Sequence, residues 1–311
     1  MIAPTLLTNL SAIAGDYDAL VCDVWGVLHN GATAFPAACA ALRNFRDRHG
    51  RVILLSNAPR PASDIEGQFE RFGVPLDCYD TIVTSGAAAR EDLARRHGAK
   101  MFHLGPDRDV NVYAGLPITR VATLDEADVV LCTGPFDDEV EGPDDYTMML
   151  GEMRLRELTF LCANPDYQVQ RGGKLVYCAG SLAQAYEALG GKVIYYGKPH
   201  LPIYDHVRAV AGGAHRFLAI GDGLKTDIKG ANAAGIDALF IADGVHGEDV
   251  REFTEKHMAE LFDRYGAYAR YAARALVHCS RTGLSLLSGK AKERPEPFQP
   301  IYLQIKSETT Q

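Results

Sequence analysis

The chain of 311 residues is 47% hydrophobic and 23% charged, which is typical of a soluble protein with two globular domains. Its formal net charge of −8 argues against a nucleic-acid partner, because binding to a phosphate backbone requires a basic surface. The longest apolar runs have strand length and the seven cysteines form no Cys-x-x-Cys pair, so we expect no membrane partner and a cytoplasmic location with reduced thiols.

Short apolar runs alternate with helical patterns in the first part of the chain. The run Ala19–Cys22 has the length of a buried strand, and a glycine-containing loop follows it. Ser63 precedes Glu66 by three residues, a spacing that predicts a capping box at the start of a helix. In order, this part predicts strands at Ala19–Cys22, Val52–Leu55 and Thr81–Thr84, and helices at Pro36–Arg48, 63–72 and Ala87–Arg96.

The same alternation returns in the later part of the chain. It predicts strands at Val193–Tyr196, Phe217–Ile220 and Ala238–Ile241, and helices at 203–210, Thr226–Ala234 and, within a C-terminal helical extension, Tyr268–Val277. Alternation of this kind predicts an α/β fold in which helices cover both faces of a doubly wound, Rossmann-like parallel sheet. Ligands of such sheets bind outside the carboxyl ends of the strands.

A second set of elements separates these two parts. It comprises strands near Met101–Leu104, Val129–Cys132 and Phe160–Ala163, and a helix near Asp145–Leu158. Because the segments on both sides read as parts of one sheet, this set predicts an inserted α/β domain. We therefore expect a core of residues 1–87 and 193–289, an inserted domain of residues 88–192 and a loosely held polar tail of residues 290–311.

Polar side chains follow four of the predicted core strands. They are Asp23, the pair Ser56 and Asn57, Lys198, and the pair Asp222 and Asp227. A carboxylate at a strand end can attack phosphorus and form an aspartyl-phosphate if a cation offsets the negative charges. Because Mg²⁺ prefers hard oxygen ligands, Asp23 and Asp222 are the expected pair of ligands, with Asp227 as a further ligand or a neighbour of the ion. Ser56, Asn57 and Lys198 would hold the oxygens of the transferring phosphoryl group.

The order of these four segments resembles the four motifs of the haloacid dehalogenase (HAD) superfamily, over residues 15–247. The long insertion is similar to the type C2 cap domain, subtype A, of the class IIA phosphatases, which are NagD-like or 4-nitrophenylphosphatase-like. Asn164-Pro165-Asp166 and Ala179-Gly180-Ser181-Leu182 also resemble that class. The resemblance implies that Asp23 is the nucleophile, that the Trp25 carbonyl is a metal ligand and that Lys198 clamps the phosphate. It also implies a cap domain that can form a homodimer.

Two further sets of residues are candidates for binding the substrate. The first follows the first two core strands and would contact the phosphate or a second anionic group: Gly26, His29, Asn30, Ser56, Asn57 and Arg60. The second lies in the cap and would set substrate specificity: Asn164, Asp166 and Tyr167. Asp107-x-Asp109-x-Asn111 begins like a calcium loop but has Val112 and Ile118 where that loop needs Gly and Glu, so we expect a solvated cap loop.

One position departs from the pattern of the phosphatases that the chain resembles. They usually carry a second Asp two residues after the nucleophile, where this chain has Trp25. That Asp would protonate the leaving alkoxide and later activate water, and loss of such acid–base help costs roughly 10²–10⁴-fold in rate. An indole can do neither, although the Trp25 carbonyl remains available to a metal.

Three functions therefore remain open. In the first interpretation, the chain is an Mg²⁺-dependent phosphatase of a small phosphorylated metabolite. It then works on a substrate with a good leaving group, or His29 or a cap residue supplies the proton. Alternatively, it is a haloacid-dehalogenase-type hydrolase, whose halide needs no proton on departure. In the third interpretation it is a catalytically weak protein that binds a phosphorylated metabolite. The acids, the lysine and the cap together favour the phosphatase.

Overall fold

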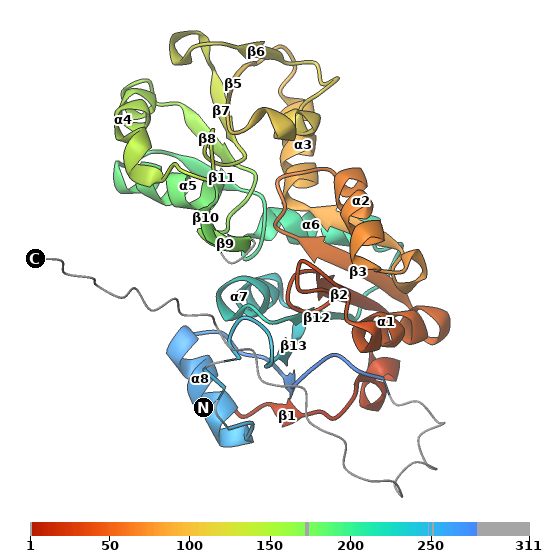
Figure 1. Ribbon diagram of the computed structural model, residues 1–311. Coiled ribbons are helices and arrows are strands. Elements are labelled where there is room, and N and C mark those ends of the chain that lie inside the picture. Colours follow the sequence, from red (N-terminus) through yellow and green to blue (C-terminus); the bar gives the residue numbers. More distant parts are fainter. Residues whose placement is uncertain (1, 172–173, 248, 251, 279–311) are drawn as a thin grey trace, which may run out of the picture. The chain divides into compact units, whose positions relative to one another are not determined.

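The computed structural model describes residues 2–278 except for residues 172, 173, 248 and 251. Two parallel sheets organise this part of the chain (Figure 1). The seven-stranded sheet has the order β1-β14-β13-β12-β2-β3-β4, and the five-stranded sheet has the order β11-β8-β7-β5-β6. A further pair, β9 and β10, is antiparallel. The predicted α/β fold, with a parallel core sheet and a second α/β unit, is confirmed.

The core contains the seven-stranded sheet and the helices that pack on it. Its strands are β1 (Thr5–Leu6), β2 (Ala19–Asp23), β3 (Arg51–Ser56), β4 (Thr81–Thr84), β12 (Phe217–Gly221), β13 (Asp237–Ile241) and β14 (Tyr271–Ala273). Its helices are α1 (Pro36–Arg48), α2 (Ala62–Phe72), α6 (Leu201–Val210), α7 (Lys229–Ala234) and α8 (Glu255–Tyr265). Glycines in the left-handed conformation end α2, α7 and α8, as is common for helix C-termini.

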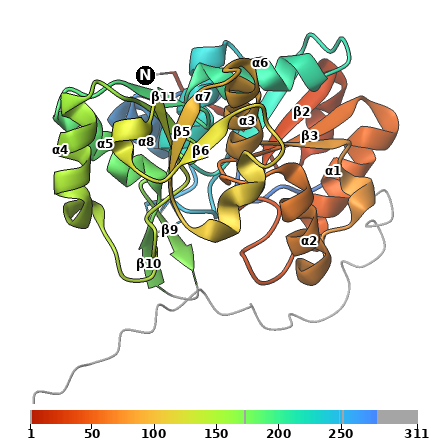
Figure 2. The ribbon, with the colours of Figure 1, turned by 90° about the horizontal axis from the view of Figure 1, so that it is seen from above.

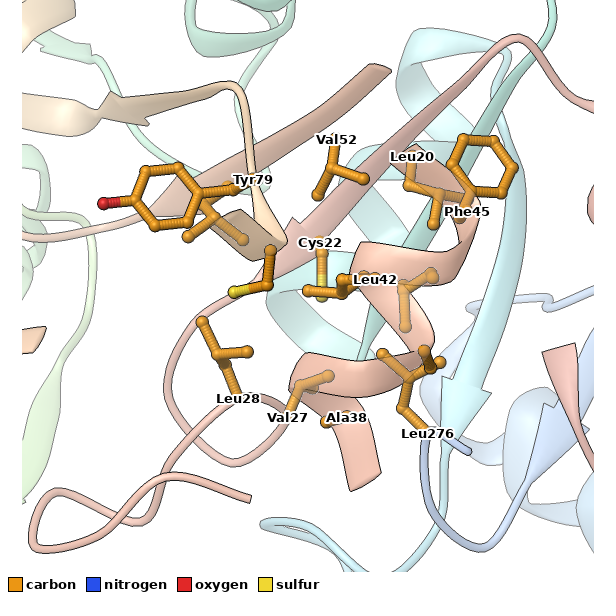
Figure 3. Close-up of a cluster of buried hydrophobic side chains, with 14 of the residues drawn as sticks. Leu20, Cys22, Val27, Leu28, Ala38, Leu42, Phe45, Val52, Tyr79 and Leu276 are labelled. Carbon is orange, nitrogen blue, oxygen red and sulfur yellow. The ribbon is translucent and has the colours of Figure 1, made fainter. Parts of the chain in front are cut away.

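Side chains of β2 alternate between the two faces of the core sheet, which explains why its sequence is apolar throughout. Leu20 and Cys22 lie in one buried cluster with Leu42 and Phe45 of α1 (Figure 3). Val21 lies in a second buried cluster, to which α6, α7 and α8 contribute. Figure 2 shows α1 and α6 on opposite sides of β2 and β3. With both faces covered, the strand ends are the places where polar groups can gather.

The cap contains the five-stranded sheet and is built in the same way. Its strands are β5 (Lys100–Leu104), β6 (Thr119–Val121), β7 (Val129–Cys132), β8 (Thr159–Cys162) and β11 (Val193–Tyr195), with β9 (Gln168–Arg171) and β10 (Lys174–Tyr177) as the antiparallel pair. Its helices are α3 (Ser85–Arg95), η4 (Asp107–Val112), α4 (Thr147–Leu155) and α5 (Ala179–Ala188). Phe160 of β8 packs in a buried cluster with Tyr186 of α5, while Leu161 lies in another with Leu93 of α3.

The strand β11 pairs with β8 of the cap sheet, whereas the predicted boundary after residue 192 assigns it to the core. All three residues of β11 are only partly buried, because it is the edge strand of its sheet. A short apolar run does not reveal which sheet supplies its hydrogen bonds, so the sequence alone misplaced it. The cap sheet thus ends just before Gly197 and Lys198.

Two local predictions are wrong. The alanine-rich segment Tyr268–Val277 is not a helix, because β14 pairs with β1 and β13, and this backbone ladder overrides helix propensity. The capping box at Ser63 does not form, since α2 begins one residue earlier with Pro61 at its N-cap. The predicted helix Thr226–Ala234 is confirmed, although it begins as a π-helical turn, η7 (Leu224–Ile228), that continues into α7. The predicted tail of residues 290–311 lies outside the described residues.

Two expectations about the chain's surroundings can be compared with the structure. Among the residues it describes, no helix has both the length and the hydropathy needed to cross a membrane. The cysteines of the described part are free and buried.

Replacing Phe160 by Ala should lower the free energy of unfolding by about 3–5 kcal/mol, because it empties the centre of the cap core. The ring is fully buried and stacks on Tyr186 with 5.7 Å between ring centroids. The control is Leu155→Ala, whose side chain is 87% exposed and whose loss should cost less than about 0.5 kcal/mol. Urea unfolding followed by circular dichroism measures both, and equal losses would contradict the described packing of the cap.

Candidate active site

The site lies at the carboxyl edge of the core sheet, where β2 and β12 run side by side. Cys22 pairs with Ile220 in the parallel register of these strands. Asp23 at the end of β2 and Asp222 just after β12 therefore reach the same edge. Asp227 follows on the π-helical turn η7, which begins two residues after Asp222. Adjacent parallel strands thus bring together acids that are far apart in sequence.

Three carboxylates and one ammonium group form the centre of the site. Oxygens of Asp23, Asp222 and Asp227 lie within 4.8 Å of one another. Lys198 Nζ donates to Asp23 Oδ1 at 2.5 Å and to Asp227 Oδ1 at 2.7 Å. Lys198 is only 3% exposed, and the three acids are buried as well. All four residues are sequence-predicted site residues, and the structure brings them into one cluster, which we call the acid–lysine cluster.

The acid–lysine cluster carries more negative than positive charge. Burial raises the pKa of Asp23 well above its ordinary value, and repulsion from Asp227 adds to this rise, while Lys198 opposes it. Burial, followed by repulsion from Asp227, raises the pKa of Asp222 to about 6. Burial alone would lower the pKa of Lys198, but the neighbouring carboxylates of Asp227 and Asp23 raise it instead. With every group ionised, two negative charges remain, which is the charge that a divalent cation balances.

The donors of this cluster fit Mg²⁺. They are carboxylate oxygens, and Mg²⁺ in phosphate-processing sites is held by one or two carboxylates, several waters and the substrate phosphate. Asp23 and Asp222 are the carboxylates that would hold the ion, because Lys198 is hydrogen-bonded to Asp227 and to only one oxygen of Asp23. The Trp25 carbonyl stays a prediction as a further ligand.

The position of Asp222 depends on two glycines in neighbouring loops. Gly26 has φ +83°, and a Cβ at Gly26 or at Gly244 would collide with the Asp222 carboxylate. Val245 N–H donates to Asp222 Oδ2 at 2.7 Å. Gly26 was predicted to contact the phosphate, but in the structure its lack of a side chain makes room for Asp222. Gly244 and Val245 were missed, although their place just after β13, the neighbour of β12, was a signal that could have found them.

The Asn57 side chain bonds the backbone N–H and the backbone carbonyl of Lys198. Lys198 N–H donates to Asn57 Oδ1 at 2.7 Å, and Asn57 Nδ2 donates to the Lys198 carbonyl at 3.1 Å. The same Nδ2 donates to Asp166 Oδ1 at 2.8 Å. Asn57 is buried, and both polar atoms of its side chain bond protein groups. The prediction made Asn57 a phosphate ligand, whereas its side chain is committed to Lys198 and Asp166.

The loop after β2 places Trp25 and His29 against each other. Trp25 is half exposed, and its ring meets that of His29 edge to face with 5.5 Å between centroids. His29 is buried and also contacts Phe69 and Phe72. Its Nδ1 accepts a hydrogen bond from Gly31 N–H at 3.0 Å. Burial lowers the pKa of His29 to about 4, so it is neutral at pH 7 and has the contacts of a packing residue.

Other predicted phosphate ligands have local partners. Asn30 Oδ1 accepts from Ala32 N–H and Thr33 N–H and so closes a turn. Ser56 Oγ accepts from Ala58 N–H at 3.2 Å. Their side chains therefore stabilise the two loops that border the acid–lysine cluster.

Arg60 pairs with the cap. Its Nε donates to Asp109 Oδ1 at 2.7 Å, and the Asp109 side chain is only 2% exposed. The prediction that the segment from Asp107 to Asn111 is solvated is thus wrong for Asp109. A buried carboxylate requires a charged or hydrogen-bonding partner, and the sequence spacing gave no sign that Arg60 supplies it.

The three predicted cap residues differ in their surroundings. Asp166 accepts the hydrogen bond from Asn57, and burial raises the pKa of its carboxyl group. Asn164 is buried, and its Oδ1 accepts from Asp166 N–H at 3.1 Å. Tyr167 is 46% exposed and packs edge to face on Tyr177. Asp166 is therefore linked through hydrogen bonds to the acid–lysine cluster, and Tyr167 is the cap residue available to a ligand.

Replacing Gly26 by Ala should weaken Mg²⁺ binding by at least about 10-fold, because its Cβ would displace the Asp222 carboxylate. The control is Gly98→Ala, which has a similar φ of +75° but no heavy atom within 4 Å of its Cβ. Titration calorimetry with Mg²⁺ measures both variants. Equal weakening in the two would show that backbone strain, not the approach to Asp222, is responsible.

Comparison with known proteins places the chain in a family. A model described as haloacid dehalogenase-like hydrolase matches residues 20–118, and one described as HAD-hydrolase-like matches residues 195–265. A haloacid dehalogenase-like hydrolase from Brucella suis 1330, known as a crystal structure, is 41% identical. That match covers 87% of this chain and 100% of the Brucella chain, with a TM-score of 0.76.

Two phosphatases are more distant relatives. Ribonucleotide monophosphatase NagD from Escherichia coli K12 is 27% identical over 238 residues, which are 74% of this chain and 89% of NagD. A glycerol phosphate phosphatase from Mycobacterium tuberculosis, solved in complex with magnesium, is 25% identical over 78% of this chain and 74% of that one, with a TM-score of 0.61. The chain belongs to the haloacid dehalogenase-like hydrolases.

Proposed function

We propose that this chain is an Mg²⁺-dependent phosphatase that hydrolyses a small phosphate monoester through an aspartyl-phosphate at Asp23. The observation that carries the proposal is the acid–lysine cluster, in which Lys198 Nζ lies 2.5 Å from Asp23 Oδ1. A buried carboxylate next to a buried ammonium group can receive an anionic phosphoryl group, because the ammonium attracts the oxygens that the carboxylate repels.

The reaction would proceed in two displacements. An oxygen of Asp23 attacks phosphorus, the bond from phosphorus to the ester oxygen breaks, and the leaving alkoxide takes a proton from solvent water. A water molecule then attacks the phosphorus of the aspartyl-phosphate and gives a proton to solvent. The bond from phosphorus to the Asp23 oxygen breaks, which releases orthophosphate and regenerates the Asp23 carboxylate. Mg²⁺, when bound, supplies positive charge at the phosphoryl oxygens. Lys198 adds positive charge beside Asp23, Asp227 holds the lysine through a hydrogen bond, and Asp222 would hold the metal.

The proposed substrates are small. The relatives reported above are named for ribonucleotide monophosphates and glycerol phosphate, and these two classes of phosphate ester are the first to test. Tyr167, which is 46% exposed on the cap, offers an aromatic surface to a nucleobase, whereas glycerol phosphate has no group to stack on it. The contribution of Tyr167 can therefore separate the two classes.

The charge of the site disfavours the alternative of carbon–halogen cleavage. A haloacid carries a carboxylate, which two uncompensated negative charges would repel, and its displacement requires no metal. A pure binding protein shares the same geometry, so turnover is the property that separates it from a phosphatase.

Purified protein with Mg²⁺ should release orthophosphate from a panel of nucleoside monophosphates, glycerol phosphate, acetyl phosphate and 4-nitrophenyl phosphate. Removing the metal with EDTA should abolish release, and Asp23→Asn should lower kcat by at least about 10³-fold, because the amide cannot serve as the nucleophile. The control is Asp205→Asn, which makes the same change at a side chain that is 75% exposed.

Release that persists in Asp23→Asn would exclude Asp23 as the nucleophile. Metal-independent release of halide from a haloacid would replace the phosphatase with a dehalogenase. Binding of orthophosphate or beryllium fluoride without turnover of any ester would indicate a binding protein.

Replacing Trp25 by Asp should raise kcat on glycerol phosphate by at least about 10-fold, because it supplies a carboxylic acid to protonate a poor leaving group. The gain on 4-nitrophenyl phosphate should be smaller, since nitrophenolate leaves without a proton. Trp25→Asn is the matched control, because it removes the same ring from His29 without adding an acid. Equal gains on both esters, or an equal gain in the control, would contradict a leaving-group defect.

A further inference from the structure

Two side chains of the loop after β3 donate hydrogen bonds to carboxylates of the cap. Asn57 Nδ2 donates to Asp166 Oδ1 at 2.8 Å, in the loop that follows β8. Arg60 Nε donates to Asp109 Oδ1 at 2.7 Å, in η4. Both hydrogen bonds join a side chain of this loop to a carboxylate of the cap. The two loop residues differ in their further hydrogen-bond partners, so one hydrogen bond can serve as the control for the other.

The Asn57 contact continues to Lys198, whereas the Arg60 contact does not. The Asn57 side chain bonds both the N–H and the carbonyl of Lys198, at 2.7 and 3.1 Å. The backbone carbonyl of Arg60 instead accepts from Thr84 Oγ1 at 2.6 Å, within the core. A continuous set of hydrogen bonds therefore runs from Asp166 through Asn57 to the residue whose ammonium group touches Asp23.

Asp166 supports the orientation in which the Asn57 amide bonds Lys198. Only one orientation of the amide offers oxygen to the Lys198 N–H and nitrogen to the Lys198 carbonyl, and the acceptor at Asp166 favours that orientation. Close packing leaves little room for adjustment, since a Cβ at Gly197 would lie 2.5 Å from Asn57 Oδ1 and 2.6 Å from Pro165 Cδ. The loop of Asp166 and the loop of Lys198 thus meet on the two sides of one side chain.

We propose that Asp166 is a positioning residue for Lys198 and acts through Asn57. Seating of the cap loop and placement of the phosphate-binding ammonium group are then one event. This inference rests on the proposed function and extends it, by assigning a cap residue to the setting of Lys198 in addition to any contact of the cap with substrate. Asp166 need not touch the substrate or exchange a proton for this role.

The test compares Asp166→Ala with Asp166→Asn and with Asp109→Ala. The alanine removes the acceptor for Asn57, whereas the asparagine keeps a side-chain oxygen that can accept the same hydrogen bond. Asp109→Ala removes the second of these side-chain hydrogen bonds, in which the carboxylate bonds Arg60 and not the acid–lysine cluster. It therefore controls for general loosening of the cap.

The first readout is hydrogen exchange of the Lys198 amide in the free protein, because that N–H donates to Asn57. Asp166→Ala should exchange at least about 10-fold faster than wild type, while Asp166→Asn and Asp109→Ala should stay within about 2-fold. Faster exchange in Asp109→Ala to the same extent, or unchanged exchange in Asp166→Ala, would overturn the proposal. This readout does not depend on substrate, so it stands even if the panel of esters shows no phosphatase activity.

The second readout is kcat on 4-nitrophenyl phosphate and on glycerol phosphate. Asp166→Ala should lose about 10-fold in kcat on both esters, because a displaced lysine harms every phosphoryl transfer alike. Asp166→Asn should retain most of the activity. Equal losses in the two variants would instead identify Asp166 as an acid–base group, and a loss confined to one ester would identify it as a substrate contact; either result would overturn the positioning role.

A double-variant comparison completes the test. If Asp166 acts only through Asn57, adding Asp166→Ala to Asn57→Ala should cause no further loss of kcat. Independent, multiplying losses would contradict the series of contacts from Asp166 to Lys198.

Discussion

The structure depends on a concentration of buried negative charge at one edge of the core sheet. Parallel strands deliver Asp23 and Asp222 to that edge, and the turn η7 adds Asp227. Such a group is unfavourable in isolation, because each carboxylate loses water and repels the others. Lys198 offsets part of the charge, and the remainder creates the demand for a divalent cation. The close approach of glycines and the bonding of Asn57 follow from the need to hold these groups in a small space.

The sequence predicted this cluster because each of its strand ends can be identified from neighbouring residues. A buried apolar run followed by an acid identifies a strand end, and parallel topology then brings such ends together. Contacts that form only in the tertiary structure could not be predicted from the sequence. They include the ion pair of Arg60 with Asp109 and the hydrogen bond from the Lys198 N–H to Asn57. The assignment of two segments failed in the same way, since β11 and β14 are each defined by the sheet with which they pair.

Trp25 and His29 differ in burial, although both lie in the loop after β2. His29 is surrounded by aromatic rings and lacks a charge at neutral pH, so it stabilises the loop. Trp25 covers His29 on one side and remains half exposed on the other. The loop therefore exposes part of an aromatic ring two residues beyond Asp23 in the sequence.

The strand β11 belongs to the cap sheet, yet Lys198 follows almost directly after it. The cation of the site is thus attached to the exit of the inserted domain, and the nucleophile is attached to the core. Cap and core are consequently not interchangeable modules. An insertion of different length or curvature, acquired by recombination with a relative, would change substrate recognition and would also shift the lysine relative to Asp23. Exchange of the cap domain is therefore constrained at its last residues. A transferred cap must return the chain to the core and also place the lysine close to Asp23.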